Sequence, residues 1–142
     1  LELDYSGYIP DSYISDQSEK MEVYKRIVSV QEDTELQTVY AELEDRFGPM
    51  PEEVQSLLSL AEIRVLCRQL HIAALRERKQ VLEIEFGRVS EINADKVVTM
   101  IQESGGSVRL DPKKPNILHI ETGVIGLKEK SEFIREKLST LM

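Results

Sequence analysis

The spacing of apolar residues changes once along this chain, and that change limits the folds open to it. Up to about residue 71, apolar residues recur every three to four positions, which is the spacing of one face of an α-helix. From about residue 72 they alternate with polar residues in short runs, which is typical of half-buried strands. Because the helical and strand patterns are partly segregated, the chain is expected to fold as an α+β protein.

A first helix is predicted over about 16–30, because Asp16 suits the N-cap position and Glu19 follows three residues later. Its inward face is predicted to carry four apolar residues at helical spacing, Met21, Tyr24, Ile27 and Val28. Residues 1–14, which precede it, are expected to be extended. Four of them are too apolar for a free tail and should pack against the helices, namely Tyr8, Ile9, Tyr13 and Ile14.

Two further helices are predicted at about 34–47 and 51–71. Thr34 with Gln37 fits a capping box at the start of the earlier one, and Gly48 suits its C-terminal end. Its core face is predicted to consist of Leu36, Val39, Tyr40, Leu43 and Phe47. The later helix has apolar residues on more than one face, so it is expected to be central and mostly buried.

The rest of the chain is predicted to continue as strand, strand, helix, strand, strand and helix. The strands are expected at about 72–76, 81–86, 107–110 and 117–121, and the helices at about 94–104 and 126–141. The polar stretch 76–80 suits a hairpin turn. The two helices are predicted to turn inward Val97, Val98 and Ile101, and Leu127, Ile134, Leu138 and Leu141. We therefore predict a small, mostly antiparallel sheet packed on helices.

The length of 142 residues fits a single domain, with a helical acidic part over 1–72 and an α+β part over 73–142. Residues 1–72 carry 15 acidic and 6 basic residues, whereas residues 73–142 carry 11 and 12. The net charge of −8 argues against direct nucleic-acid or membrane partners. The chain starts at Leu1 within a strand-like alternation, so we expect it to be a segment of a longer protein.

Catalytic and cofactor-binding motifs are absent from the sequence. It contains neither G-x-x-x-x-G-K-[ST] nor G-x-G-x-x-G, so no nucleotide site is predicted. His71 and His119 stand outside any metal-ligand spacing. The single cysteine, Cys67, lies among apolar residues, excludes a disulfide framework and favours a reducing, cytoplasmic compartment. No catalytic residue, metal or cofactor is therefore predicted.

Two other hypotheses stay open at this point. Glu83 and Glu85 share one face of a strand and could bind a divalent cation or act as an acid/base pair, although a solvated sheet face is favoured. Basic residues near the predicted turns could contact DNA, but no aromatic residues lie among them. These basic residues are Arg76, Arg78, Lys79, Lys113 and Lys114.

An acidic stripe is predicted on helix 34–47, opposite its apolar face, with Glu35, Glu42 and Asp45 as its carboxylates. Glu42 can pair with Arg46 four residues later, whereas Glu35 and Asp45 have no obvious basic partner within the helix. The stripe is therefore either a solvated face or a docking surface for an arginine-rich partner, because carboxylates accept bidentate guanidinium contacts.

Three segments of the chain resemble the C-terminal domain of bacterial transcription-repair coupling factors. The resemblance is carried by Tyr8-Ile9-Pro10-Asp11 with Tyr13-Ile14, by Tyr24-Lys25-Arg26-Ile27, and by residues 42–51, ELEDRFGPMP. It implies a parent protein that is an ATP-driven translocase on double-stranded DNA, binds stalled RNA polymerase and recruits excision-repair proteins. It also implies that this domain is regulatory and lacks the motor.

The same resemblance implies a partner for the domain. In the family the domain packs against an N-terminal module similar to UvrB, covers the surface that recruits UvrA, and restrains the motor. Glu42 and Asp45 precede the Arg46-Phe47-Gly48 motif, where the family places acidic contacts to that module, whereas Glu35 is a candidate on helix geometry alone. The alternative is a free-standing adaptor that binds another protein through the same helix.

Overall fold

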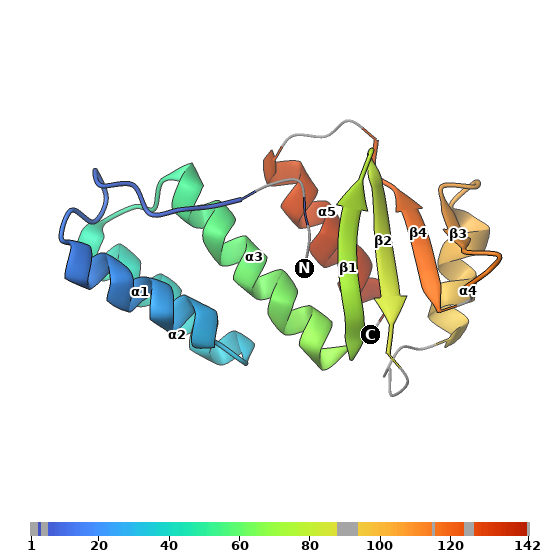
Figure 1. The fold of residues 1–142 in the computed structure, drawn as a ribbon, viewed down its shortest axis with the longest axis horizontal. Coiled ribbons are helices and arrows are strands. Elements are labelled where there is room, and N and C mark those ends of the chain that lie inside the picture. Colours follow the sequence, from blue (N-terminus) through green and yellow to red (C-terminus); the bar gives the residue numbers. More distant parts are fainter. Residues whose placement is uncertain (1–2, 4–5, 88–93, 115, 124–126, 142) are drawn as a thin grey trace. The chain divides into compact units, whose positions relative to one another are not determined.

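In the computed structural model, the described residues form five helices and a four-stranded sheet (Figure 1). The structure describes the whole chain except residues 1–2, 4–5, 88–93, 115, 124–126 and 142. The chain divides into two compact units, which we call the helical unit, Tyr5–Val65, and the sheet unit, Leu1–Asp4 with Leu66–Met142. The predicted α+β class is confirmed, as is the antiparallel sheet.

The helical unit contains α1 (Gln17–Ser29), α2 (Asp33–Phe47) and most of α3 (Glu52–Gln69). These helices and the segment before α1 supply one apolar core. Its buried residues are Ile9, Ile14, Val23, Ile27, Val30, Leu36, Val39, Leu43, Met50, Val54, Leu58, Ala61 and Val65. Burial of this apolar surface is the main force that holds three short helices together.

The predicted N-cap of α1 is confirmed, and its predicted apolar stripe is confirmed at Tyr24 and Ile27 but is wrong at the other two positions. The Asp16 carboxylate accepts hydrogen bonds from the backbone N–H groups of Ser18 and Glu19. Met21 and Val28, however, are 56% and 68% exposed. Val23 and Val30 join Ile27 in the core, since their i, i+4, i+7 spacing forms a second stripe that is apolar at every position.

The predicted start of α2, at about residue 34, is correct to within one residue, but the predicted capping box of Thr34 with Gln37 is wrong. The helix begins at Asp33, after an extended N-cap residue, Glu32, that makes no side-chain cap bond. The backbone N–H of Leu36 already donates to the Glu32 carbonyl, so Thr34 lies inside the first turn and cannot cap it. The C-terminal end at Phe47 is as predicted, and Gly48 follows it with a positive φ of 88°, but its ψ of −168° differs from the left-handed helical cap that we expected.

The segment that precedes α1 packs as expected at three of its four apolar residues. Ile9 and Ile14 are buried, and Tyr13 packs against the core. Tyr8 is 56% exposed, so the prediction that it packs is wrong. Adjacent side chains of an extended segment point in opposite directions, so the burial of Ile9 turns Tyr8 outward.

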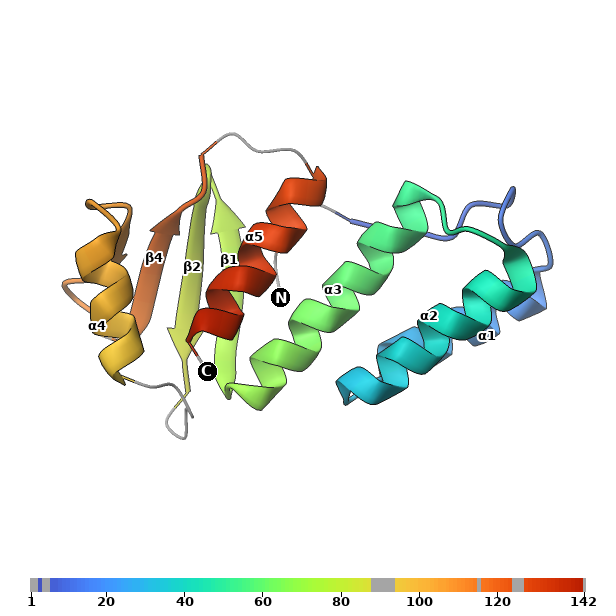
Figure 2. The ribbon, with the colours of Figure 1, turned by 180° about the vertical axis from the view of Figure 1, so that it is seen from behind.

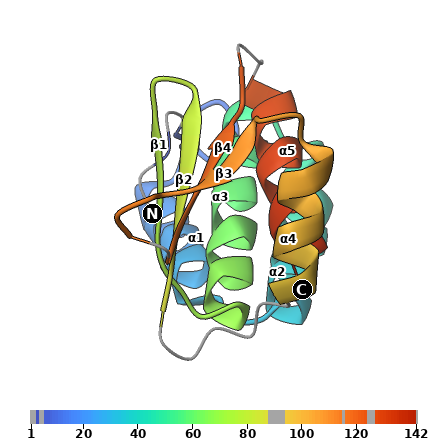
Figure 3. The same cartoon turned by 90° about the vertical axis from the view of Figure 1, so that its right-hand side faces the viewer.

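The sheet unit is built on strand order β1-β2-β4-β3, with every neighbouring pair antiparallel. Its elements are β1 (Ile72–Arg78), β2 (Val81–Phe86), α4 (Ala94–Glu103), β3 (Val108–Leu110), β4 (Ile117–Glu121) and α5 (Leu127–Thr140). Helices α4 and α5 lie on the same face of this sheet (Figures 2 and 3). The other face carries alternating polar side chains.

The predicted inward residues of the two later helices are partly confirmed. On α5, Ile134, Leu138 and Leu141 are buried, whereas the side chain of Leu127 lies outside the described part. On α4, Val98 is 51% exposed and Met100 is buried in its place. Val97 and Ile101, which were also predicted to face inward, are partly buried and lie about one helical turn or less from Met100, so these three residues share the buried side of α4.

The β1–β2 turn is tighter than the five polar residues 76–80 predicted. Residues 76–78 continue β1, and only Lys79 and Gln80 form the turn, with φ of 50° and 64°. Two consecutive positive φ values are typical of a type I′ hairpin turn, which favours Asn-Gly. The Gln80 carbonyl also accepts hydrogen bonds from the backbone N–H and the hydroxyl of Thr122.

Replacing Gln80 with glycine is therefore expected to stabilise the protein by about 1 kcal/mol, because glycine adopts a positive φ without steric cost. Urea unfolding followed by circular dichroism measures this gain. Gln80→Ala is the matched control and should give no gain. Equal stabilities of the glycine and alanine variants would contradict the left-handed backbone at this position.

Candidate protein-docking surface

The acidic residues predicted to form one stripe on α2 differ in their surroundings. Glu35 and Asp45 are exposed, whereas the Glu42 side chain is half-buried, at 36% exposure. Among the described residues, the Asp45 carboxylate makes no hydrogen bond or ion pair. The Glu35 carboxylate accepts a long hydrogen bond of 3.4 Å from the backbone N–H of Gln31. Asp45 is thus the carboxylate most available to a partner.

Glu42 belongs to an ion-pair network between α1 and α2. Arg26 of α1 donates from Nη1 to Oε2 of Glu42. Arg46 lies one helical turn after Glu42, with 3.7 Å between Nη1 and Oε1, as the sequence predicted. Arg46 Nη2 also lies 3.3 Å from Oε1 of Glu19 on α1. We call Glu19, Arg26, Glu42 and Arg46 the α1–α2 ion-pair network.

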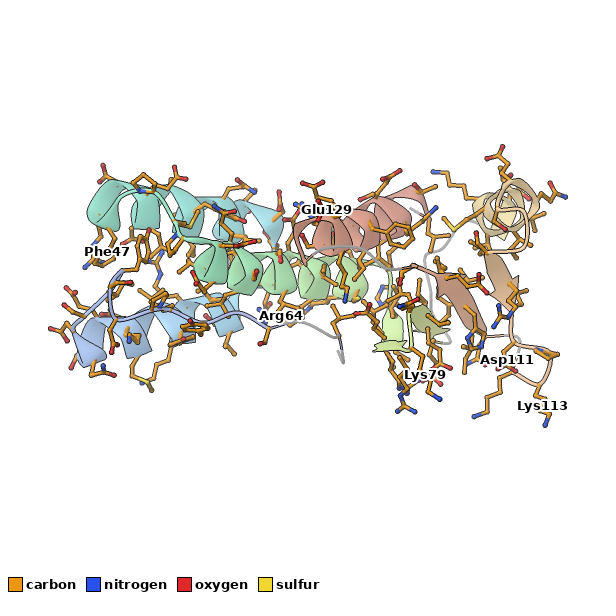
Figure 4. The ribbon with its side chains drawn as sticks, turned by 90° about the horizontal axis from the view of Figure 1, so that it is seen from above. Phe47, Arg64, Lys79, Asp111, Lys113 and Glu129 are labelled. Carbon is orange, nitrogen blue, oxygen red and sulfur yellow. The ribbon has the colours of Figure 1, made fainter. Side chains whose placement is uncertain are left out.

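Aromatic and cap contacts fix the C-terminal end of α2. The Tyr13 hydroxyl lies 3.1 Å from the Leu43 carbonyl oxygen, near the end of the helix, and 2.9 Å from the carbonyl oxygen of the C-cap residue Gly48, so it can donate to either. Burial raises the pKa of Tyr13, and the Glu44 carboxylate adds to the rise. The Arg46 guanidinium stacks 4.9 Å from the centre of the Phe47 ring, labelled in Figure 4. Asp45 therefore projects from a fixed helix end.

The helical unit has an uncompensated excess of negative charge. Residues 5–65 contain 13 acidic and 5 basic residues. Lys20 pairs with Asp11, and Arg64 (Figure 4) donates to the Ile27 carbonyl at the end of α1 over 2.7 Å. With Arg26 and Arg46 in the network, Lys25 is the one basic residue of this unit without a bond to the described residues. The surface around the exposed acidic residues of this unit therefore has a negative electrostatic potential.

The carboxylates considered for a cation site, Glu83 and Glu85, lie in a polar ladder across the sheet. Arg76 on β1 approaches both, at 3.4 Å and 3.8 Å. On the next strand, His119 Nδ1 lies 4.0 Å from Glu83, and its Nε2 lies 3.1 Å from Asp111. That hydrogen bond holds the pKa of Asp111 below its ordinary value. Across the described ranges, no group of three or more acidic, histidine or cysteine side chains could hold a metal.

The remaining candidate residues do not come together. Lys79, like Asp111 and Lys113, lies on the side of the sheet away from α5 in Figure 4. It stands on a different turn from Lys113, and the carboxylates of the ladder lie between the two turns. Burial raises the pKa of Cys67 to about 11, so its thiol is protonated at neutral pH. In the described part of the chain, no helix is long and apolar enough to cross a membrane.

The ion pair between Arg26 of α1 and Glu42 of α2 was not predicted from the sequence. Arg26 stands 16 positions before Glu42, so no helical spacing connects the two. The one signal available was the position of Arg26 within Tyr24-Lys25-Arg26-Ile27, one of the segments that carry the resemblance.

Comparison with known proteins gives one consistent result. A family model described as the TRCF domain matches residues 3–97. The transcription-repair-coupling factor of Borreliella burgdorferi is 32% identical over 141 residues, which cover 99% of this chain and 12% of that protein. The Escherichia coli K12 protein of the same name is 29% identical over 141 residues, with the same coverage. The chain thus spans about one eighth of these relatives.

A solved structure has the same fold. The crystal structure of the C-terminal domain of transcription-repair coupling factor superposes with a TM-score of 0.84 at 23% sequence identity. The match covers 99% of this chain and 90% of that one, so both the helical unit and the sheet unit have counterparts there.

Proposed function

Because this chain belongs to the TRCF domain family, we propose that it is a non-catalytic, regulatory interaction domain of a bacterial, cytoplasmic transcription-repair coupling factor. The parent protein is then an ATP-dependent DNA translocase that acts on stalled RNA polymerase in excision repair. The domain packs through the acidic side of α2 onto the UvrB-like N-terminal module of the same parent. In doing so it masks the recruitment of UvrA and restrains the motor.

The observation that carries this proposal is the exposed Asp45 carboxylate, which is unengaged among the described residues and lies on a fixed helix end of an acidic unit. A carboxylate in that setting is suited to a guanidinium on the partner, which binds it through two parallel hydrogen bonds. Glu35 lies on the same helix. Glu42, about one turn before Asp45, is already paired with Arg26 within the domain. Asp45 is therefore the central contact, with Glu35 and Glu42 as supporting contacts.

A weak polar contact is sufficient for such a restraint. A domain linked to its partner meets it at an effective concentration of the order of millimolar, so a dissociation constant near or below that keeps the parent mostly closed. An interface of this strength opens when a competing ligand binds the open state with modestly higher affinity. A large apolar interface would instead leave a sticky surface after opening.

Asp45→Lys is expected to weaken binding to the UvrB-like module about tenfold or more, because a guanidinium contact becomes a repulsion. Calorimetry of this chain with the module as a separate polypeptide, at low and high salt, measures the effect. Wild-type binding should itself weaken with salt, since the contact is electrostatic. Asp45→Lys is preferable to Glu42→Lys, which would place a third cation beside Arg26 and Arg46.

The matched control is Glu22→Lys, which makes the same charge change at an exposed position on α1. If the effect belongs to the docking surface, Glu22→Lys leaves the affinity within about twofold of wild type. Equal losses in the two variants would show only a general charge effect. No binding of the wild-type chain at roughly millimolar concentration would refute the proposal.

A further inference from the structure

The α1–α2 ion-pair network already occupies part of the docking surface. Both carboxylate oxygens of Glu42 face a guanidinium of the same domain, Oε2 toward Arg26 and Oε1 toward Arg46. The side chains of the Arg26–Glu42 pair are 39% and 36% exposed, so the pair stands at the surface and can be reached from solvent. A guanidinium from a partner would therefore meet Glu42 where Arg26 is already bound.

Arg26 and Arg46 differ in how easily a guanidinium of a partner could displace them from Glu42. Arg46 is held by Glu19, by Glu42 and by the face of the Phe47 ring. Arg26 has Glu42 as its one ion-pair partner among the described residues. It also comes from another helix, so it can swing away without distorting α2. Arg26 is thus the group that an incoming guanidinium would displace.

We propose that Arg26 is an internal competitor that lowers the affinity of the domain for its basic partner by occupying Glu42. This inference rests on the proposed function, since it presupposes docking through the carboxylates of α2. In the free domain Arg26 binds Glu42. On docking, a guanidinium of the partner takes its place and Arg26 turns to solvent. The exchange keeps Glu42 paired in both states, so the domain can be released without leaving the Glu42 carboxylate unpaired.

The size of the effect follows from the strength of an exposed ion pair. Such pairs contribute little to stability because solvent screens them, and breaking one changes an equilibrium by about two- to fivefold. Arg26→Gln is therefore expected to tighten binding to the UvrB-like module about two- to fivefold. Lys25→Gln is the matched control, since it removes the same charge from the adjacent residue, which does not pair with Glu42.

The test compares four chains with the wild type by calorimetry against that module, namely Arg26→Gln, Lys25→Gln, Glu42→Gln and Arg26→Gln with Glu42→Gln. The proposal expects Arg26→Gln to bind more tightly than Lys25→Gln, and expects the gain to vanish when Glu42 is also replaced. Circular dichroism checks that each variant keeps its helices.

The other outcomes separate this inference from the proposed function. If the wild type binds and Asp45→Lys does not, but Arg26→Gln equals Lys25→Gln, competition is refuted while docking stands. Weaker binding of Arg26→Gln than of Lys25→Gln also refutes it, because Arg26 would then orient Glu42 for the partner. If neither the wild type nor any variant binds, both proposals fail.

Discussion

Gly7→Ala is expected to destabilise the helical unit by about 3 kcal/mol, although it adds a single methyl group. A Cβ at position 7 would lie 2.2 Å from the backbone nitrogen of Leu57 and 2.7 Å from the carbonyl oxygen of Glu53. These are backbone atoms of α3, and a hydrogen-bonded helix cannot yield by the ångström or more required. The segment that precedes α1 must therefore move away.

The cost is large because that segment completes the core of the helical unit. The backbone N–H of Tyr8 donates to the Glu53 carbonyl over 3.2 Å, and that of Ile9 donates to the Tyr24 hydroxyl over 2.7 Å. Ile9 is 3% exposed. Moving the segment breaks these two hydrogen bonds and uncovers an isoleucine side chain, whose burial contributes roughly 1.5 to 3 kcal/mol.

Urea unfolding of the 142-residue chain measures the loss, and hydrogen exchange of the Tyr8 and Ile9 amides locates it. Ser6→Ala, at the exposed neighbouring residue, is the control and should be neutral. Gly48→Ala is a second comparison, because its Cβ meets open space and only the backbone conformation is penalised, at about 1 to 3 kcal/mol. A Gly7→Ala variant as stable as Ser6→Ala would contradict the close approach to α3.

Gly7 also illustrates what a sequence shows and what it leaves hidden. Its neighbours Ile9 and Ile14 are apolar enough to predict that the segment packs. Nothing in the sequence shows that position 7 itself touches a helix more than forty residues later. Periodicity predicts which local element forms. It does not predict which tertiary contact excludes a side chain.

The helices show the same division. The N-cap at Asp16 and the end of α2 before Gly48 were predicted correctly because capping depends on the residue and its immediate neighbours. The inward face of α1 was predicted only in part, because Met21 and Val28 have the same helical spacing from each other as the residues that are buried in their place, Val23 and Val30. The choice between two such stripes depends on how α1 packs against the rest of the helical unit.

The acidic residues of α2 could be identified from the sequence, but their surroundings could not. A helical wheel places Glu35, Glu42 and Asp45 together because it treats α2 as an isolated cylinder. The structure sets Glu42 beside α1, where Arg26 neutralises it, and leaves Asp45 toward solvent. Sequence spacing therefore identifies candidate carboxylates, and only the tertiary contact ranks them by availability.

Lys130→Met is expected to destabilise the sheet unit by about 3 kcal/mol, because it removes the cation that faces a buried carboxylate. Glu77 lies on the side of β1 turned toward α5, and its side chain is 2% exposed. The Lys130 ammonium reaches it from α5, with 3.2 Å between Nζ and Oε2, and is itself 15% exposed. A carboxylate this deeply buried depends on its cation, since water cannot solvate it.

The double variant Glu77→Leu with Lys130→Met separates the pair from simple loss of packing. Two apolar side chains of similar volume can replace a buried ion pair at little cost, so the double variant is expected to recover most of the lost stability. Lys137→Met is the control on the same helix, because Lys137 lies over the Phe133 ring and pairs with no carboxylate in the described ranges. Urea unfolding gives the three free energies, and hydrogen exchange of the β1 amides assigns the change to this unit. A double variant less stable than Lys130→Met would refute the argument, because the charge on Glu77 would then not be the source of the loss.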